Sequence, residues 1–165
     1  MTSAITKDSE KVKIIQVESE KLLNHIRKLF IEYAASLNFD LCFQNFDKEL
    51  AELPGEYNPP DGLLLLAFYD KKVAGCVALR PLSKNICEMK RMYVRPEFRG
   101  KGIGRHLSQT IIEKAREIDY KSMRLDTIPS MKEAIVLYKS LGFKKIKPYR
   151  HNPIKGAMYF ELKLT

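Results

Sequence analysis

The sequence predicts a mixed α/β chain of the α+β type, with a mostly antiparallel, twisted sheet of about seven strands flanked by helices. Seven segments have strand length and four are candidate helices, two of which have the three-to-four spacing of apolar residues that marks an amphipathic helix. Short connections join three consecutive strands, which makes them antiparallel neighbours. A helix follows the third of these strands and leads to the next one, which implies a right-handed parallel crossover.

The composition is that of a globular domain. Of the 165 residues, 45% are hydrophobic and 30% are charged, which argues against disorder and suffices for one core. We expect residues 1–11 to be a flexible N-terminus and residues 12–165 to form a single domain. The longest apolar run, Leu63–Phe68, has strand length, and the N-terminus lacks the apolar core of a secretion signal. The sequence therefore predicts a cytoplasmic protein without a membrane partner.

The cysteines and histidines show no metal-ligand spacing. Cys42, Cys76 and Cys87 are odd in number, and no two of them form a CxxC pair. This pattern is typical of a reducing compartment, without a disulfide framework or a zinc site. The histidines are scattered along the chain, so we expect no metal.

The first third of the chain is predicted to hold one strand and two helices. Val12–Val17 has strand character, and Ser19 is a candidate N-cap for a helix that follows. The apolar residues of that helix at helical spacing are Leu22, Ile26, Leu29, Tyr33 and Leu37. A shorter helix is predicted over Gln44–Leu53, where Pro54 and Gly55 end it, and a Pro-Pro-Asp-Gly turn follows at 59–62.

Three strands and a crossover form the middle of the chain. The strands are predicted over Leu63–Tyr69, Val73–Arg80 and Ile86–Val94, with a hairpin-length connection between the first two. A helix over Ile103–Ile118 carries one apolar stripe, and Ser122–Asp126 is the strand to which it leads.

One helix and two strands are predicted to complete the domain. Ser130–Glu133 has the Ser-x-x-Glu pattern of a capping box, which would open a helix that ends at Leu141 before a glycine. Phe143–Tyr149 and Ala157–Leu164 are predicted as the last strands, separated by the turn-rich sequence HNPIKG. No repeat, low-complexity tract or linker interrupts this order.

The stretch Met89–Gly104, MKRMYVRPEFRGKGIG, carries the clearest chemical signal. A strand runs into a turn with Gly100, Gly102 and Gly104, and a helix begins there. Glycines let phosphate oxygens approach the backbone N–H groups at a helix start, where the dipole also favours anions. Six basic residues and one acidic residue give Lys90–Arg105 a net charge of +5. The stretch therefore indicates a phosphate-binding site.

Other phosphate-binding classes fit this stretch less well. A P-loop needs GxxxxGK followed by Ser or Thr, and neither feature is present. A dinucleotide fingerprint would start at Gly102 but meets Leu107 at its third glycine position. The net charge of +9 also suits nucleic acid, yet the chain lacks interleaved aromatic residues and zinc-finger or helix-turn-helix spacing. We therefore expect a polyphosphate cofactor, and nucleic acid is the disfavoured partner.

Two motifs resemble those of the GNAT superfamily of acetyl-CoA-dependent N-acetyltransferases. Arg99-x-x-Gly102-x-Gly104 is similar to the family's Arg/Gln-x-x-Gly-x-Gly/Ala loop, and Leu137–Phe143 is similar to its Leu-Tyr-x-x-x-Gly-Phe motif. The similar region spans Cys87–Phe143, and the N-terminal third is similar only in layout. The resemblance implies the GNAT fold and transfer of an acetyl group from acetyl-CoA to a primary amine, by direct attack in a ternary complex.

The resemblance also implies roles for individual residues. The backbone of Met92, Tyr93 and Val94 would pair with the pantetheine arm, and the Val94 amide would polarise the acetyl carbonyl. Tyr138 would protonate the departing thiolate, and Glu88 would take a proton from the attacking amine. The pyrophosphate-binding candidates are Arg99, Gly100, Lys101, Gly102, Ile103, Gly104 and Arg105.

The resemblance defines the acceptor less well than the cofactor. Met131 stands where many relatives carry an Asn that contacts the cofactor arm, so no contacts are expected from this turn. In the family the acceptor lies near the early helices and the last-strand loop, here the acidic section Asp40–Asp61 and Arg150–Gly156. The acids could attract a cationic amine, whereas Arg150 or His151 could meet a substrate carboxylate.

The amine acceptor can therefore be a small molecule or a protein amine. The sequence leaves it open whether the protein forms a homodimer. The alternative to an enzyme is a non-catalytic module on the same fold that senses acyl-CoA or binds nucleic acid.

Overall fold

The computed structural model describes residues 11–37, 40–41 and 45–165. The strands are β1 (Val12–Gln16), β2 (Leu63–Tyr69), β3 (Lys72–Pro81), β4 (Ile86–Val94), β5 (Ser122–Thr127), β6 (Lys144–Ile146) and β7 (Met158–Lys163). The helices are α2 (Glu20–Ser36), α3 (Phe46–Glu52), α4 (Ile103–Ile118) and α5 (Lys132–Ser140), with 3₁₀ turns η2 (Gly55–Tyr57) and η3 (Pro96–Phe98). Residues 1–10, which hold nearly all of the predicted flexible N-terminus, lie outside the described residues, as does Cys42.

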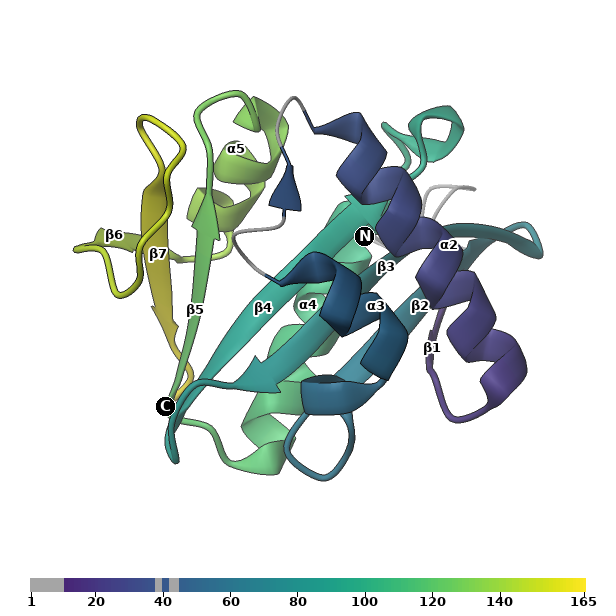
Figure 1. The fold of residues 1–165 in the computed structure, drawn as a ribbon, viewed down its shortest axis with the longest axis horizontal. Helices are drawn as coiled ribbons and strands as arrows, with labels where there is room; N and C mark the ends of the chain where they lie inside the picture. Colours follow the sequence, from purple (N-terminus) through teal and green to yellow (C-terminus); the bar gives the residue numbers. More distant parts are fainter. Residues whose placement is uncertain (1–10, 38–39, 42–44) are drawn as a thin grey trace, which may run out of the picture.

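The strands form one seven-stranded sheet in the order β1-β2-β3-β4-β5-β7-β6 (Figure 1). All of its neighbouring strands pair antiparallel except β4 and β5, which are parallel. This confirms the predicted mixed sheet and its single parallel crossover through α4. The last strand in the sequence, β7, lies between β5 and β6, so that the chain end is inside the sheet rather than at its edge.

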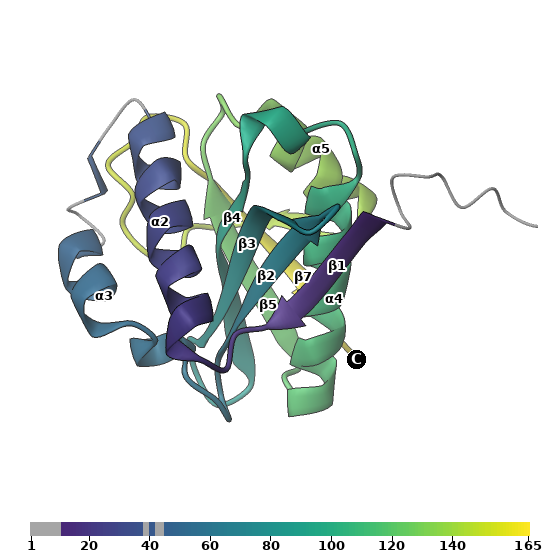
Figure 2. The same ribbon diagram turned by 90° about the vertical axis from the view of Figure 1, so that its right-hand side faces the viewer.

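The helices cover both faces of the sheet, with α2 and α3 on one face and α4 and α5 on the other (Figure 2). The run Leu63–Ala67 in β2 shows why the strand sequence is continuously apolar. Leu63, Leu65 and Ala67 pack in the core under α4, while Leu64 and Leu66 pack in the core under α2. A strand that is buried on both faces needs no polar alternation.

Two of the predicted helix starts follow the local sequence, a third does not, and the fourth, Gln44, lies outside the described residues. Ser19 caps α2 as predicted, since its hydroxyl accepts a hydrogen bond from the Leu22 N–H at 3.2 Å. Helix α4 has the predicted bounds and starts after Gly102. The predicted capping box at Ser130 is wrong. The N-cap of α5 is Met131, whose N–H donates to Ile128 O in a turn, and no side chain caps this helix.

The strand predicted over Phe143–Tyr149 is also too long. Strand β6 ends at Ile146, because the chain then leaves the sheet and Tyr149 turns back toward β4. The Tyr149 hydroxyl donates to Glu88 at 2.7 Å, and the guanidinium groups of Arg124 and Arg150 lie 5.3 and 5.1 Å from the centre of its ring. These long-range contacts override the local strand character of the segment.

A β-bulge in β4 and the parting of β4 from β5 shape the site. The register shifts between Cys76 and Ala78, so that Arg91 and Met92 of β4 oppose one residue of β3, and Arg91 has a positive φ of 58°. Among the described residues, β4 pairs with β5 only over Ile86–Glu88. Beyond Glu88 the two strands diverge, which leaves an open strand edge on β4.

Candidate active site

A cleft of about 700 Å³ lies where the carboxyl end of β4, the start of α4 and the start of α5 meet. Both helices follow strands of the parallel pair β4–β5, so their first turns lie at the same end of the sheet. Crevices at the carboxyl ends of parallel strands are common ligand sites, because helix N-termini converge there. This cleft is larger than two other cavities, of about 60 Å³ beside Lys90 and of about 230 Å³ around Arg80.

The start of α4 has the features of an anion site. Gly100 and Gly102 have positive φ angles of 80° and 79°, which glycine adopts without strain. Gly102 is the N-cap and lacks a side chain, and no acidic residue occupies the first turn of α4. The first N–H groups of this helix are therefore open toward the cleft. The backbone conformation supports the predicted phosphate-binding turn.

Most of the predicted cofactor residues line this cleft. They are Met92, Tyr93, Val94, Arg99, Gly100, Gly102, Ile103 and Gly104. Two predicted residues point elsewhere: the Lys101 ammonium lies 5.0 Å from the Tyr69 ring centre, and Arg105 donates to the Ser140 hydroxyl. The structure therefore brings Arg99 into the cleft but directs the side chains of its two basic neighbours to other partners.

The edge of β4 that faces the cleft offers backbone groups to a ligand. Arg95 N–H donates to Ala74 of β3, so the alternation of a strand turns the N–H and C=O of Val94 the other way, toward the gap. The Val94 C=O indeed points away from β3, because it accepts a hydrogen bond from the Arg99 Nε at 3.0 Å. An extended chain could add to this open edge as a further strand.

Sequence reasoning missed one wall of the cleft. It comprises residues of α2, of η3 and of the first turns of α5: Tyr33, Ser36, Phe98, Ser130, Met131, Lys132, Glu133, Ala134 and Leu137. Contacts from the Met131 turn were not expected, yet Met131 lines the cleft. The parallel crossover was the signal that could have located α5, because it places the helix after β5 beside the start of α4.

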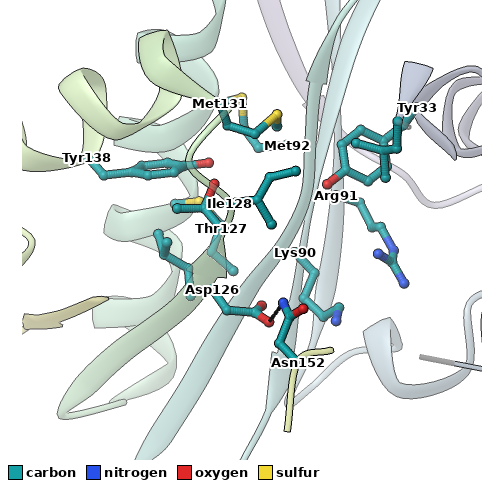
Figure 3. A pocket seen from close by; sticks show the side chains of 13 residues that line it. Tyr33, Lys90, Arg91, Met92, Asp126, Thr127, Ile128, Met131, Tyr138 and Asn152 are labelled. Carbon is teal, nitrogen blue, oxygen red and sulfur yellow. Dashed lines mark hydrogen bonds between the residues drawn. The ribbon is translucent and has the colours of Figure 1, made fainter. Parts of the chain in front are cut away.

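A smaller inner cavity of about 60 Å³ continues from the cleft into the gap between β4 and β5. Tyr33, Met92 and Met131 line both spaces, so the two cavities meet at these residues. In Figure 3 the Tyr138 ring reaches in from α5, with its hydroxyl toward the middle of the cavity. Asp126, Asn152 and Lys90 lie at the other end, where Asn152 donates to Asp126 at 3.2 Å.

Tyr138 is suited to donate a proton in this cavity. Its side chain is buried, and its ring packs edge-on against the Phe143 ring, with 5.8 Å between the two ring centres. Burial raises the pKa of the Tyr138 phenol well above its ordinary value, so the hydroxyl stays protonated at neutral pH. A protonated phenol next to the meeting point of the two cavities fits the predicted acid role.

Glu88 lies outside both cavities. Its carboxylate is fully buried, and it accepts hydrogen bonds from Arg80, Tyr149 and Arg150. The Lys90 ammonium is 3.9 Å away. Burial alone would raise the pKa of Glu88, but Lys90, Arg80 and Arg150 outweigh burial and lower that pKa. The carboxylate is thus engaged by its own protein and does not face the space where an amine would bind.

Two acidic residues of the section Asp40–Asp61 form ion pairs with arginines of the same protein. Glu49 of α3 accepts two hydrogen bonds from Arg91, at 2.9 and 3.1 Å, and Glu56 forms an ion pair with Arg80. Arg150, one of the two residues that could meet a substrate carboxylate, donates to Glu88 instead. Asn152 is the residue of the last-strand loop that reaches the inner cavity.

The two cysteines that the structure describes are poor nucleophiles. Cys76 and Cys87 are both fully buried, and Cys87 lies in the core on the face opposite Glu88, as the strand alternation predicted. Burial raises the pKa of the Cys87 thiol to about 12 and that of Cys76 further. In the described ranges we find no cluster of potential metal ligands and no helix long and apolar enough to span a membrane.

Comparisons with known proteins agree with this architecture. The model of the acetyltransferase (GNAT) family matches residues 23–143. An uncharacterized N-acetyltransferase of Schizosaccharomyces pombe is 42% identical over 156 residues, which cover 93% of this chain and 96% of that protein. N-acetylaspartate synthetase of Xenopus tropicalis is 36% identical over 101 residues, 61% of this chain but only 37% of that protein.

A solved structure shares the fold. The Salmonella typhimurium protein yncA, determined with its cofactor acetyl-CoA, has a TM-score of 0.72 at 19% identity and covers 94% of this chain and 95% of that chain. The fold is that of the acetyltransferase (GNAT) family. The chain belongs to the GNAT family of acetyltransferases, and it is an N-acetyltransferase.

Proposed function

We propose that this N-acetyltransferase moves an acetyl group from acetyl-CoA to the primary amine of a small molecule, by direct attack while both substrates are bound. The observation that carries the proposal is the junction of two cavities at Tyr33, Met92 and Met131. These three residues line both the large cleft, which contains the glycine turn at the start of α4, and the small polar cavity. Two substrates can therefore meet without an acyl-enzyme, which agrees with the burial of Cys76 and Cys87.

The residues of the cleft fit acetyl-CoA. The start of α4 and Arg99 would hold the pyrophosphate, and the open edge of β4 at Met92–Val94 would pair with the pantetheine arm. When bound, acetyl-CoA supplies a thioester, which is an activated acetyl carbonyl with a thiolate leaving group. The Val94 N–H faces the gap and would donate to the acetyl oxygen as negative charge develops on it. Tyr138 would donate its proton to the departing sulfur.

The small volume of the inner cavity, about 60 Å³, favours a small acceptor over a protein segment. The similarity to N-acetylaspartate synthetase, which is named for a small product, supports the same choice. Holding the amine and the thioester together can supply an effective molarity of about 10⁵ M or more.

A screen of amines tests this proposal. Purified protein and acetyl-CoA are mixed with small amines, polyamines and lysine-containing peptides, and both CoA thiol release and acetylated product are measured. The proposal expects product with at least one class of small amine. Stabilisation by acetyl-CoA without turnover of any amine would indicate a sensor, and salt-sensitive DNA or RNA binding without an acyl-CoA effect would indicate a nucleic-acid module.

We predict that Arg99→Gln weakens acetyl-CoA binding by about tenfold or more, because Arg99 is the basic side chain of the turn that lines the cleft. Lys101→Gln is the matched control, and it should have a smaller effect because Lys101 points toward Tyr69. Isothermal titration calorimetry with acetyl-CoA measures both dissociation constants. Equal effects of the two substitutions, or no effect of Arg99→Gln, would contradict the assignment.

A further inference from the structure

Asp126 is a carboxylate that faces the inner cavity. Glu88 and Arg124 are the last register pair of the parallel β4–β5 ladder, so Asp126 lies on the same face of the sheet as Glu88 but two positions nearer the carboxyl ends. This step of roughly 6.6 Å carries Asp126 past the point where the two strands part. Among the described residues that line the inner cavity, Asp126 is the only acidic one.

Asn152 orients this carboxylate. Its amide donates to Asp126 Oδ2 at 3.2 Å, and its own oxygen accepts from the Ile154 N–H at 3.0 Å, which holds the amide in one direction. The Lys90 ammonium lies at the same end of the cavity (Figure 3), and it pairs with Glu88 at 3.9 Å. A carboxylate can accept about four hydrogen bonds, so Asp126 can bind Asn152 and a ligand N–H at the same time.

Glu88 differs from Asp126 in location and in surroundings. It is fully buried, lines neither of the two cavities, and accepts hydrogen bonds from Arg80, Tyr149 and Arg150. Asp126 is only partly buried and reaches the cavity. A proton acceptor must come within hydrogen-bond reach of the proton that it takes. Of these two carboxylates, Asp126 is therefore the one that a bound amine can meet.

Asp126 and Tyr138 reach the cavity from opposite faces of the sheet. Leu125, the neighbour of Asp126 in β5, packs in the same core as Tyr138, so strand alternation turns Asp126 to the other face. In Figure 3 the carboxylate and the phenol lie at different ends of the cavity. Acetyl transfer needs a proton acceptor at the nitrogen and a proton donor at the sulfur, two different atoms around one carbonyl carbon. The cavity provides one group of each kind.

We propose that Asp126 is the catalytic base: its carboxylate binds the ammonium of the acceptor and takes the proton that blocks the nitrogen lone pair. The lone pair then forms the bond to the acetyl carbon, while the C–S bond breaks and its electron pair goes to the sulfur, which takes the Tyr138 proton. The nitrogen loses a second proton to solvent, and Tyr138 regains its proton from solvent, so one proton is released for each acetyl group transferred. This inference rests on the proposed acetyl transfer, since it names the base of that reaction.

Two amines that differ in basicity test the assignment. The probes are the best amine of the screen and its β,β-difluoro analogue, whose nitrogen is mostly neutral at the assay pH because fluorine withdraws electrons. Asp126→Asn keeps the size of the side chain but removes the group that takes the proton. We expect it to lower kcat/KM by about 10²- to 10⁴-fold with the basic amine, and by at least about tenfold less with the neutral amine.

Two further variants provide the comparison. Glu161→Gln is the matched control, because Glu161 is also a partly buried carboxylate beside β5, paired with Arg124, and it lines neither of the two cavities. It should leave both rates unchanged. Glu88→Gln tests the competing carboxylate, and any loss of rate that it causes should be equal for the two amines.

The possible outcomes separate this inference from the function on which it rests. An equal loss with both amines in Asp126→Asn, or no loss with either, would overturn the assignment and leave the acetyl transfer standing. A loss confined to the basic amine in Glu88→Gln would also overturn it. No turnover of any amine by the wild type would instead overturn the proposed function.

Melting temperature and acetyl-CoA affinity show whether each variant keeps its fold. If Asp126→Asn does not fold, Asp126→Ser takes its place with the same expected result, because a serine hydroxyl also fails to take a proton from an ammonium.

Discussion

Replacing Glu88 with alanine is expected to lower the free energy of unfolding by about 3–5 kcal/mol, because it removes the shared partner of one buried and two partly buried cations. Arg80, Lys90, Tyr149 and Arg150 all surround this fully buried carboxylate. The Arg150 guanidinium and the Tyr149 hydroxyl would then lose the carboxylate that accepts their hydrogen bonds. Urea unfolding of the wild type and the variant measures the difference.

Glu56→Ala is the matched control for this experiment, since Glu56 pairs with the same Arg80 but its side chain is 66% exposed. Surface ion pairs contribute about 0–1 kcal/mol, so this variant should remain close to the wild type. If Glu88→Ala kept its stability while the rate of acetyl transfer collapsed, the result would favour the base role that the family resemblance implies for Glu88.

The same network gives the stability a dependence on pH. The pKa of Glu88 is lower in the folded protein than its ordinary value, so the carboxylate contributes stability above that ordinary value. The contribution is lost as the pH falls through the lowered pKa. Glu88→Gln should therefore flatten the acid limb of stability against pH, as followed by melting temperature, and an unaltered acid limb would contradict this.

Replacing Tyr138 with phenylalanine is expected to reduce kcat by about 10²- to 10⁴-fold, the usual contribution of a positioned proton donor. The ring, its contact with Phe143 and its packing would remain, so acetyl-CoA affinity and melting temperature should change little. Steady-state rates over a range of pH measure the effect. Burial raises the pKa of the Tyr138 phenol, which keeps it a donor throughout the neutral range.

Tyr120→Phe serves as the matched control for this substitution. The Tyr120 hydroxyl donates to Asp61 O, and the residue lines neither of the two cavities. It should therefore leave kcat unchanged. Equal rates for Tyr138→Phe and the wild type at every pH would show that Tyr138 does not act as the acid.

The fold and the glycine turn at the start of α4 were predictable because their signals are local. Ser19, Gly102 and the apolar stripe of α4 act within one or two helical turns, and the structure places all three as expected. The seven strands and the parallel crossover followed from segment lengths and connections. A cytoplasmic location and a homodimer stay predictions from the sequence.

The interior of the site was less predictable, because it is made by contacts between distant parts of the chain. Glu88 is bound by Tyr149 and Arg150, which are 61 and 62 positions away in the sequence. The bulge at Arg91 places that arginine against Glu49, and no local pattern marks a non-glycine residue with positive φ. These contacts explain why the Glu88 carboxylate of β4 is part of the interior rather than of the cavity.

Two-substrate kinetics test the central claim most directly. Initial rates are measured while the concentrations of acetyl-CoA and of the best amine of the screen are both varied. In a second experiment, the mass of the protein is measured by mass spectrometry after incubation with acetyl-CoA alone. Direct transfer in a ternary complex predicts intersecting double-reciprocal lines and no acetylated protein as a reaction intermediate. Parallel lines, together with an acetyl-protein that passes its acetyl group to the amine, would contradict it.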